Sequence, residues 1–143
     1  MQENILIHIE STQVQDDGTP DSIDLMCDGL FYERDGKYYI KYKETELTGM
    51  EGASTLLKID GEQISMTRFG TSNTHFVFQK GQVKSSYYET PYGSFLMMVS
   101  TRRAESEMGT DSGRIYLEYG LDISEMSHSD NTFRISYRLK SKN

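Results

Sequence analysis

Apolar and polar residues alternate with a period of two along most of this chain, which is the pattern of strands that bury one face. In the longest runs, apolar or aromatic residues take alternate positions. These runs are NILIHIEST at 4–12, SIDLMCDGLFYE at 22–33, KYYIKYKET at 37–45, SFLMMVST at 94–101, RIYLEYGLDIS at 114–124 and TFRISYRLK at 132–140. Shorter runs of the same kind are STLLKID at 54–60, QISMTRF at 63–69 and NTHFVFQK at 73–80. The chain is therefore predicted to be all-β.

Turn-forming residues separate these runs. Asp-Gly pairs lie at 35–36 and 60–61, and Asp-Gly is the strongest short-range signal for a hairpin. The segment YETPYG at 88–93 is a further candidate, because Pro91 has no N–H for a ladder and Gly93 permits a sharp bend. The connections are too short for the crossover helix that parallel strands need. We therefore expect neighbouring strands to be antiparallel.

One stretch lacks strong β character. It is STRRAESEMGTDSG at 100–113, where charged and small residues replace the alternation. A single helical turn and a continued polar strand are both compatible with this composition. We expect a polar strand that ends in a mobile loop rather than a helical turn.

Nine or ten strands with one apolar face each must bury those faces together. An open sheet of that size would leave two exposed edges, whereas a closed barrel removes the edges and encloses one core. A two-sheet sandwich is the alternative, but that fold usually has longer connections between its sheets. We predict a single domain over residues 1–143, an antiparallel up-and-down barrel of about 8–10 strands, similar to the calycins (lipocalin-like).

The chain is acidic, with 15 basic residues, 22 acidic residues and a net charge of −7. Non-specific nucleic-acid binding and attachment to anionic membranes depend on basic residues, so both are disfavoured. No window approaches the roughly 18 apolar residues of a membrane span, and the first residues lack the pattern of a signal peptide. Cys27 is the only cysteine, so no intrachain disulfide can form. We expect a cytoplasmic protein.

Several segments resemble the YwiB-like family of small bacterial cytoplasmic proteins of unknown function. They are YYIKYKETEL at 38–47, EGASTLLKI at 51–59, MTRFG at 66–70, YETPYGSFLMMVSTRR at 88–103 and YLEYGLDI at 116–123. The resemblance covers essentially the whole chain and implies a calycin-like β-barrel without assigned catalytic residues. Marks of other calycins are missing: the chain has no Trp for the lipocalin Gly-X-Trp, and no segment suits the helical lid of fatty-acid-binding proteins.

The barrel interior is the first candidate site. A barrel of about eight strands is either filled by side chains or encloses room for one small ligand. Aromatic and methionine side chains are typical of both a packed core and an apolar pocket. The residues expected to line a cavity are Tyr38, Tyr42, Phe76, Phe78, Phe95, Met97 and Tyr119. Because buried hydroxyls need partners, the tyrosines among them are expected near a barrel mouth.

Basic residues gather on one face of the last run. They are Arg134, Arg138 and Lys140, with Lys142 beyond them. Cross-strand pairing with Glu118 and Asp122 of the preceding run is the favoured explanation. The alternative is an interaction stripe that docks an acidic partner or RNA.

Motifs for catalysis and metal binding are missing from the sequence. The three histidines have no ligand spacing, and a structural zinc site needs about four ligands. There is no Gly-X-Ser-X-Gly elbow and no P-loop. The carboxylates considered for acid–base chemistry, Glu44, Glu89 and Glu118, are expected to be solvated on outer faces. We predict that the protein is not an enzyme and has no metal and no cofactor.

Two functions remain open at this point. The first is non-catalytic binding of a small, partly apolar ligand in the barrel or at its mouth. The second is a protein-interaction module with a packed interior, which would dock another protein or a second copy of itself. Exposed tyrosines such as Tyr88 or Tyr116 would mark a dimer surface. An internal cavity would favour the first function, and a filled interior the second.

Overall fold

The computed structural model describes residues 2–44, 52–70, 73–124 and 127–140, and of residues 88–90 the backbone alone. Within these ranges the chain forms strands and turns, and no helix is long and apolar enough to cross a membrane. The strands are β1 (Gln2–Gln15), β2 (Pro20–Arg34), β3 (Lys37–Lys43), β4 (Ser54–Asp60), β5 (Gln63–Phe69), β6 (Thr74–Phe78), β7 (Val83–Thr90), β8 (Gly93–Met108), β9 (Ser112–Ile123) and β10 (Ser127–Leu139).

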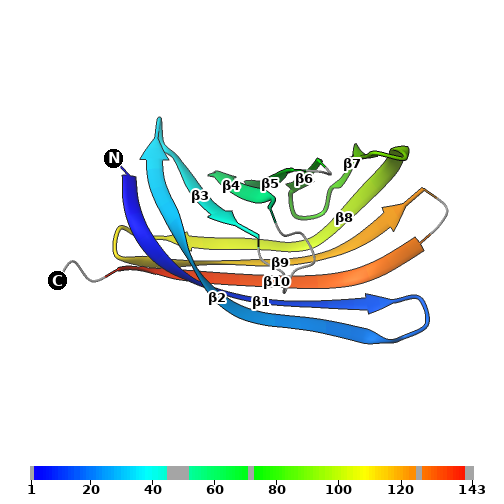
Figure 1. The fold of residues 1–143 in the computed structure, drawn as a ribbon, viewed down its shortest axis with the longest axis horizontal. Helices are drawn as coiled ribbons and strands as arrows, with labels where there is room; N and C mark the ends of the chain where they lie inside the picture. Colours follow the sequence, from blue (N-terminus) through cyan, green and yellow to red (C-terminus); the bar gives the residue numbers. More distant parts are fainter. Residues whose placement is uncertain (1, 45–51, 71–72, 125–126, 141–143) are drawn as a thin grey trace.

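The ten strands form one antiparallel sheet in the order β6-β5-β4-β3-β2-β1-β10-β9-β8-β7. The first and last strands of the chain are neighbours, paired from Ile5–Leu139 to Gln15–Ser129. The sheet curls until β6 and β7 lie beside each other without a shared ladder (Figure 1). Across this seam the hydroxyl of Ser86 donates a hydrogen bond to the carbonyl of His75 at 2.8 Å. The predicted up-and-down barrel is confirmed, and it is closed except at this seam.

The alternation in the sequence corresponds to the inward and outward faces of the strands. Ile5, Ile7 and Ile9 of β1 are buried, whereas His8 and Glu10 face outward and are partly exposed. The same alternation holds along the other strands. Inward side chains with almost no exposed surface include Ile40, Leu57, Ile64, Met66, Phe78, Met97, Ile115, Leu117 and Ile135. Full burial of such a side chain stabilises the fold by about 1.5–3 kcal/mol.

Two predicted turns join neighbouring strands as expected. Asp35 (φ 53°) and Gly36 (φ 78°) both have positive φ, as a type I′ turn requires, and they connect β2 to β3. Pro91 and Tyr92 connect β7 to β8, whose last ladder pair is Thr90 with Gly93. The proline therefore lies outside the ladder, where its missing N–H leaves no bond unmade. The corner predicted at this segment is confirmed as a hairpin turn.

The polar stretch at 100–113 extends strand β8, as preferred over a helical turn. The strand continues through Met108, and a short connection at 109–111 leads to β9. A β-bulge at Arg102 places Arg102 and Arg103 together opposite Glu118, which pairs with them at 3.4 and 3.9 Å. The outward charges of this polar strand are thus matched by β9. Local composition alone does not reveal that contact.

Candidate ligand cavity in the barrel

The inward faces of the strands change from apolar to polar along the barrel. On β1, Ser11 and Gln13 continue the inward face beyond Ile9. On the paired strand β10, Gln13 has Asn131 as its register partner, and Ser129 continues the same inward face. Asn131 and Ser129 are both buried, and Nδ2 of Asn131 donates a hydrogen bond of 3.0 Å to Oγ of Ser129. Nε2 of Gln13 also donates to Oγ of Ser129 at 3.3 Å. The interior therefore has an apolar filled end and a polar end.

Aromatic rings close the filled end, which lies on the side of the chain termini (Figure 1). The ring of Phe31 stacks with those of Tyr38 and Tyr137, at centroid distances of 6.0 and 5.0 Å. The hydroxyl of Tyr137 donates to the carbonyl of Gly109 at 2.6 Å. These contacts satisfy a buried hydroxyl and leave the interior packed at this end.

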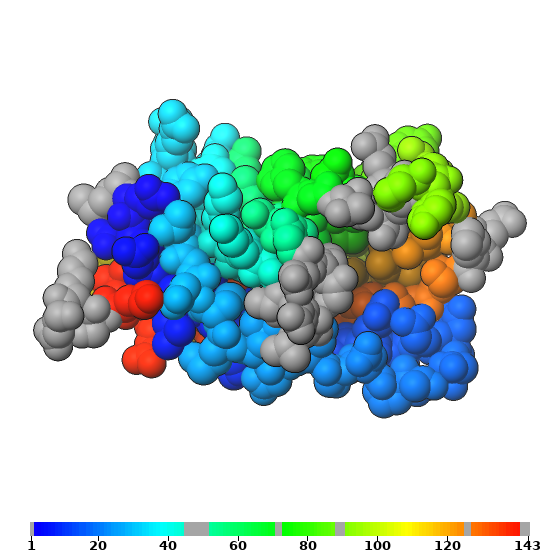
Figure 2. Space-filling view, in the orientation of Figure 1, coloured from blue at the N-terminus to red at the C-terminus, as the bar shows by residue number. Residues whose placement is uncertain are grey.

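A cavity of about 290 Å³ occupies the polar end. In the space-filling view, the β1–β2 hairpin (blue) and the β7–β8 hairpin (green) lie on opposite sides of this end of the molecule (Figure 2). The apolar side chains that line the cavity are Ile9, Ile23, Met66, Phe76, Leu121 and Phe133. The polar ones include Ser11, Gln13, Tyr42, Glu44, Arg68, Tyr119 and Asn131. Such a mixture, with a few polar groups in an apolar wall, is typical of small-molecule sites.

A buried ion pair forms part of the cavity wall. The side chain of Glu44 is 1% exposed, and its Oε2 lies 3.5 Å from Nε of Arg68. The same oxygen accepts a hydrogen bond from the hydroxyl of Thr55. The register aligns Tyr42, Thr55 and Arg68 across β3, β4 and β5, and Glu44 follows β3 directly. The expectation that Glu44 is a solvated outer residue is wrong, because it continues the inward alternation past the end of the strand.

Burial changes the acidity of two tyrosines in the wall. Desolvation raises the pKa of Tyr42 well above its usual value, and the Glu44 carboxylate adds to this shift while Arg68 opposes it. Burial likewise raises the pKa of Tyr119. Both hydroxyls are therefore protonated at neutral pH. They can donate a hydrogen bond to a bound molecule, and they are unsuited to act as bases.

Three buried polar atoms of the interior have no hydrogen-bond partner among the described residues. They are Nε of Arg68 and the hydroxyls of Thr74 and Thr101. Nε of Arg68 is at ion-pair distance from Glu44 but makes no hydrogen bond to a described residue. Thr74 is the register partner of Arg68, and Thr101 is the register partner of Tyr119. Such atoms are rare in folded proteins and cost about 1–3 kcal/mol each. They occur beside residues that line the cavity.

The structure separates the seven residues that were expected to line a cavity. Tyr42, Phe76 and Tyr119 line it. The other four lie elsewhere in the barrel: Phe78 and Met97 in the buried core, Tyr38 at the filled end, and Phe95 half-buried on β8. A role in ligand binding stays a prediction for all of them.

The basic residues of β10 face outward, as expected. The guanidinium of Arg134 lies 5.2 Å from the ring centre of Tyr116, and that of Arg103 lies 4.7 Å from the same ring. Lys140 pairs with Asp28 of β2 at 3.0 Å. Arg138 is exposed and makes no ion pair within the described ranges. Lys142 lies outside the described residues.

The acidic residues expected to pair with this basic face have other partners. Glu118 faces outward on β9, as expected, but contacts the arginines of the β8 bulge. Asp122 accepts a hydrogen bond from Nδ1 of His128 at 2.7 Å. The side chains of Glu89 and Tyr88 fall outside the part of the chain whose side chains are described. Use of the basic face as an interaction stripe stays a prediction.

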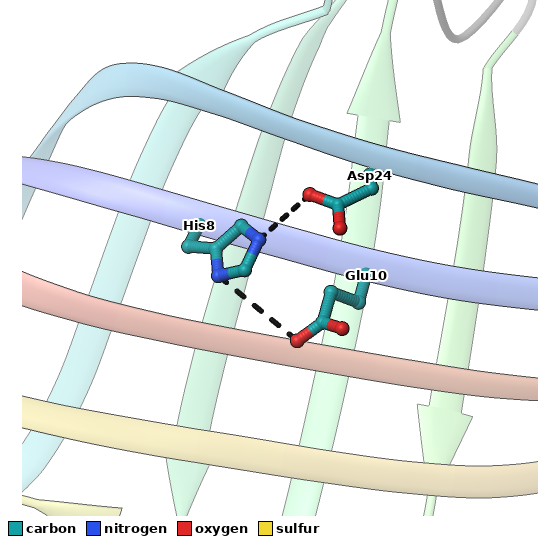
Figure 3. A group of neighbouring side chains, drawn as sticks. All are labelled: His8, Glu10 and Asp24. Atoms are coloured by element: carbon teal, nitrogen blue, oxygen red, sulfur yellow. Dashed lines mark hydrogen bonds and ion pairs between the residues drawn. The ribbon is translucent and has the colours of Figure 1, made fainter.

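Two carboxylates flank His8 on the outer faces of β1 and β2 (Figure 3). Nε2 of His8 lies 2.7 Å from Oδ1 of Asp24, and Nδ1 lies 4.0 Å from Oε1 of Glu10. One possible ligand atom from each residue lies within 4.8 Å of the others. The two ring nitrogens point toward different carboxylates, however, so the ligands do not converge on one point as a metal requires. We interpret this cluster as hydrogen bonding on the surface.

Sequence reasoning missed Arg68 in the cavity wall and Thr55, which donates a hydrogen bond to Glu44, as well as the polar wall residues Ser11, Gln13 and Asn131. A signal for the first two was present, because Arg68 continues the inward series of Ile64 and Met66, and Thr55 continues that of Leu57 and Ile59. A charged residue at an inward position of a barrel strand needs a buried partner. That requirement would have indicated an acidic residue such as Glu44 on the inner face.

Comparisons with known proteins agree with the fold. The chain matches the family model described as "Domain of unknown function (DUF1934)" over residues 7–135. It is 23% identical to the "Uncharacterized beta-barrel protein YwiB" of Bacillus subtilis (strain 168) over 133 residues, which cover 93% of this chain and 92% of that protein. The crystal structure of ywiB protein from Bacillus subtilis is similar with a TM-score of 0.86 and 21% identity, over 98% of this chain and 94% of that chain. These matches confirm the resemblance seen in the sequence segments, and the chain belongs to the DUF1934 family.

Proposed function

We propose that this protein binds a small, partly apolar ligand in the cavity at the polar end of the barrel. The observation that carries the proposal is the wall of this cavity, where a buried ion pair, with Nε of Arg68 making no hydrogen bond to the described residues, stands beside an apolar surface. A barrel interior that served only as a core would be expected to place apolar side chains there. Buried polar groups that lack partners call for an explanation, and a ligand that supplies the partner provides one.

The cavity volume limits the size of the ligand. Water occupies about 30 Å³ per molecule in the liquid, so 290 Å³ corresponds to about ten non-hydrogen atoms. This is near the lower limit of small-molecule sites, which extend from about 300 to 1,000 Å³. A single ring with a short polar chain fits this range.

Binding without catalysis is part of the proposal. The Glu44 carboxylate is engaged by Thr55 and Arg68, and its side chain is 1% exposed, so it offers little access to a substrate. Burial raises the pKa of Tyr42 and Tyr119 further above their usual value, which disfavours either as a base. A cytoplasmic setting also belongs to the proposal and rests on the single cysteine of the chain.

Native mass spectrometry of protein purified without denaturation tests the proposal, together with a thermal-shift screen of small carboxylates, amides and amines. Ser11→Leu places a larger side chain in the cavity, and Ser136→Leu places the same side chain on the outer face of β10 as a matched control. We expect an adduct or a stabilising ligand for the native protein and Ser136→Leu, and its loss in Ser11→Leu. Binding that survives in Ser11→Leu would place the ligand elsewhere. If the native protein shows neither an adduct nor a stabilising ligand, the proposal is refuted.

Self-association is a second candidate, because exposed apolar residues gather on the outer face of β7 and β8. Tyr87 and Leu96 are register partners, and they are 63% and 42% exposed. Val83 and Met98, on the same face, are 56% and 42% exposed. Sedimentation velocity would test for a dimer that Leu96→Lys disrupts, and a monomer at all concentrations would exclude it.

A further inference from the structure

We propose that the ligand of the cavity carries a carboxylate group, which the guanidinium of Arg68 binds. This inference rests on the proposed function and specifies its chemistry. Arg68 is held between the buried Glu44 and the open volume of the cavity, and its neighbours in the wall offer further hydrogen-bond donors.

The two members of the ion pair differ in access to the cavity. The side chain of Arg68 is 20% exposed, whereas that of Glu44 is 1% exposed. Oε2 of Glu44 already accepts a hydrogen bond from Thr55 and faces Nε of Arg68. Glu44, held by Thr55, thus positions the arginine from the buried side of the wall. A molecule that enters the cavity meets the positive member of the pair.

The hydrogen-bonding groups around Arg68 need acceptors. A guanidinium has five N–H donors and no acceptor, and within the described ranges the only partner of Arg68 is Glu44, at ion-pair distance. The hydroxyl of Thr74, the register partner of Arg68, is buried without a partner. The hydroxyl of Tyr119, in the cavity wall, is protonated at neutral pH and can donate as well. The guanidinium of Arg68 and the hydroxyl of Tyr119, both in the cavity wall, can donate hydrogen bonds to an oxygen-rich anionic group.

A carboxylate suits this position better than other anions. Its two oxygens match the planar fork of a guanidinium, which binds them through two parallel hydrogen bonds. Its single negative charge is balanced more easily than the double charge of a phosphate, because Glu44 already lies on the other side of the arginine. The apolar remainder of the ligand would contact Met66, Phe76 and Phe133. These side chains favour a ring or a short hydrocarbon chain.

Three probes that share one ring and differ in charge test the inference by isothermal titration calorimetry. They are phenylacetate (anionic), phenylacetamide (neutral) and phenethylamine (cationic), each with about ten non-hydrogen atoms, the size that the cavity admits. We expect phenylacetate to bind about 10-fold or more tightly than phenylacetamide, and phenethylamine to bind most weakly, because the charge-assisted bonds to Arg68 are lost.

Substitutions of Arg68 identify the group responsible. Arg68→Gln should bring phenylacetate to within about 2-fold of phenylacetamide. Arg68→Lys keeps the charge, so it tests the inference even if Arg68→Gln fails to fold. It should weaken phenylacetate by about 5- to 10-fold, because the fork is lost, while the anion remains preferred over the amide.

The outcomes separate this inference from the proposed function. If the amide or the amine binds as tightly as phenylacetate, the carboxylate assignment is wrong while a ligand cavity stands. If all three probes fail but the native protein carries a co-purified molecule that Ser11→Leu loses, the assignment again fails alone. If neither a probe nor a co-purified molecule binds, both are overturned. If Arg68→Gln still binds phenylacetate more tightly than phenylacetamide, Arg68 is not the group that binds the carboxylate.

Discussion

The most direct physical consequence of the cavity wall concerns the stability of the Glu44–Arg68 pair. Arg68→Met replaces the guanidinium by an apolar side chain and leaves the Glu44 carboxylate buried, with Thr55 as its remaining partner. Removal of one member of a buried pair costs about 3–5 kcal/mol. Because Arg68 is 20% exposed and Thr55 remains, we expect the lower end, about 3 kcal/mol.

This loss corresponds to a clear shift of the melting temperature. The entropy of unfolding is about 2.1 cal/mol/K per residue, which for 143 residues gives roughly 0.3 kcal/mol/K. A loss of 3 kcal/mol therefore lowers Tm by about 10 °C.

Urea unfolding, followed by far-UV circular dichroism and by the fluorescence of the ten tyrosines, measures the effect. The control is the double variant Glu44→Leu/Arg68→Met, which removes both charges. It should regain most of the lost stability, because an apolar pair of similar volume can replace a buried ion pair at little cost. A loss below about 1 kcal/mol in Arg68→Met, or an equal loss in the double variant, would refute the reasoning.

Three further predictions concern other parts of the barrel. Gly29→Ala should cost about 1–3 kcal/mol in urea unfolding, because its new Cβ would lie 2.3 Å from Cδ1 of Ile7 and 2.8 Å from the carbonyl of Lys41; a change within about 0.5 kcal/mol would contradict this. Burial, with smaller contributions from Glu44 and Asp28, raises the pKa of Cys27 from 9.0 to about 11. The reaction of Cys27 with Ellman's reagent at pH 8 should therefore be about 100-fold slower in the folded protein than in urea. Equal rates would show an accessible thiolate. The hydrogen bond to Asp122 raises the pKa of His128 above 6.5. This pair stabilises the folded protein by about 0.5 kcal/mol after solvent screening. The stabilisation is complete below pH 6.5 and is lost as the pH rises through the pKa of His128 in the folded protein. His128→Gln should abolish this dependence between about pH 5.5 and 8, and an unchanged profile would assign it to other groups.

The strands, their buried faces and the tight turns could be predicted from the sequence because they depend on local chemistry. The alternation of Ile5, Ile7 and Ile9 determines which face of β1 is buried, and Asp35-Gly36 specifies a tight turn. The hairpin at Pro91 follows from the missing N–H of proline. These features indicate a barrel because many one-faced strands must share a core.

The candidate site depended on contacts between strands that are distant in sequence. The polar strand at β8 is stabilised by Glu118 of β9, through a bulge that local composition does not indicate. Glu44 lies just past the end of β3, and only the register of β3, β4 and β5 brings it to Arg68. The sequence by itself determined the buried apolar face of regular strands such as β1. The tertiary structure decided which end of the barrel is filled and which end retains a cavity, because that depends on how side chains from seven strands fill one shared volume.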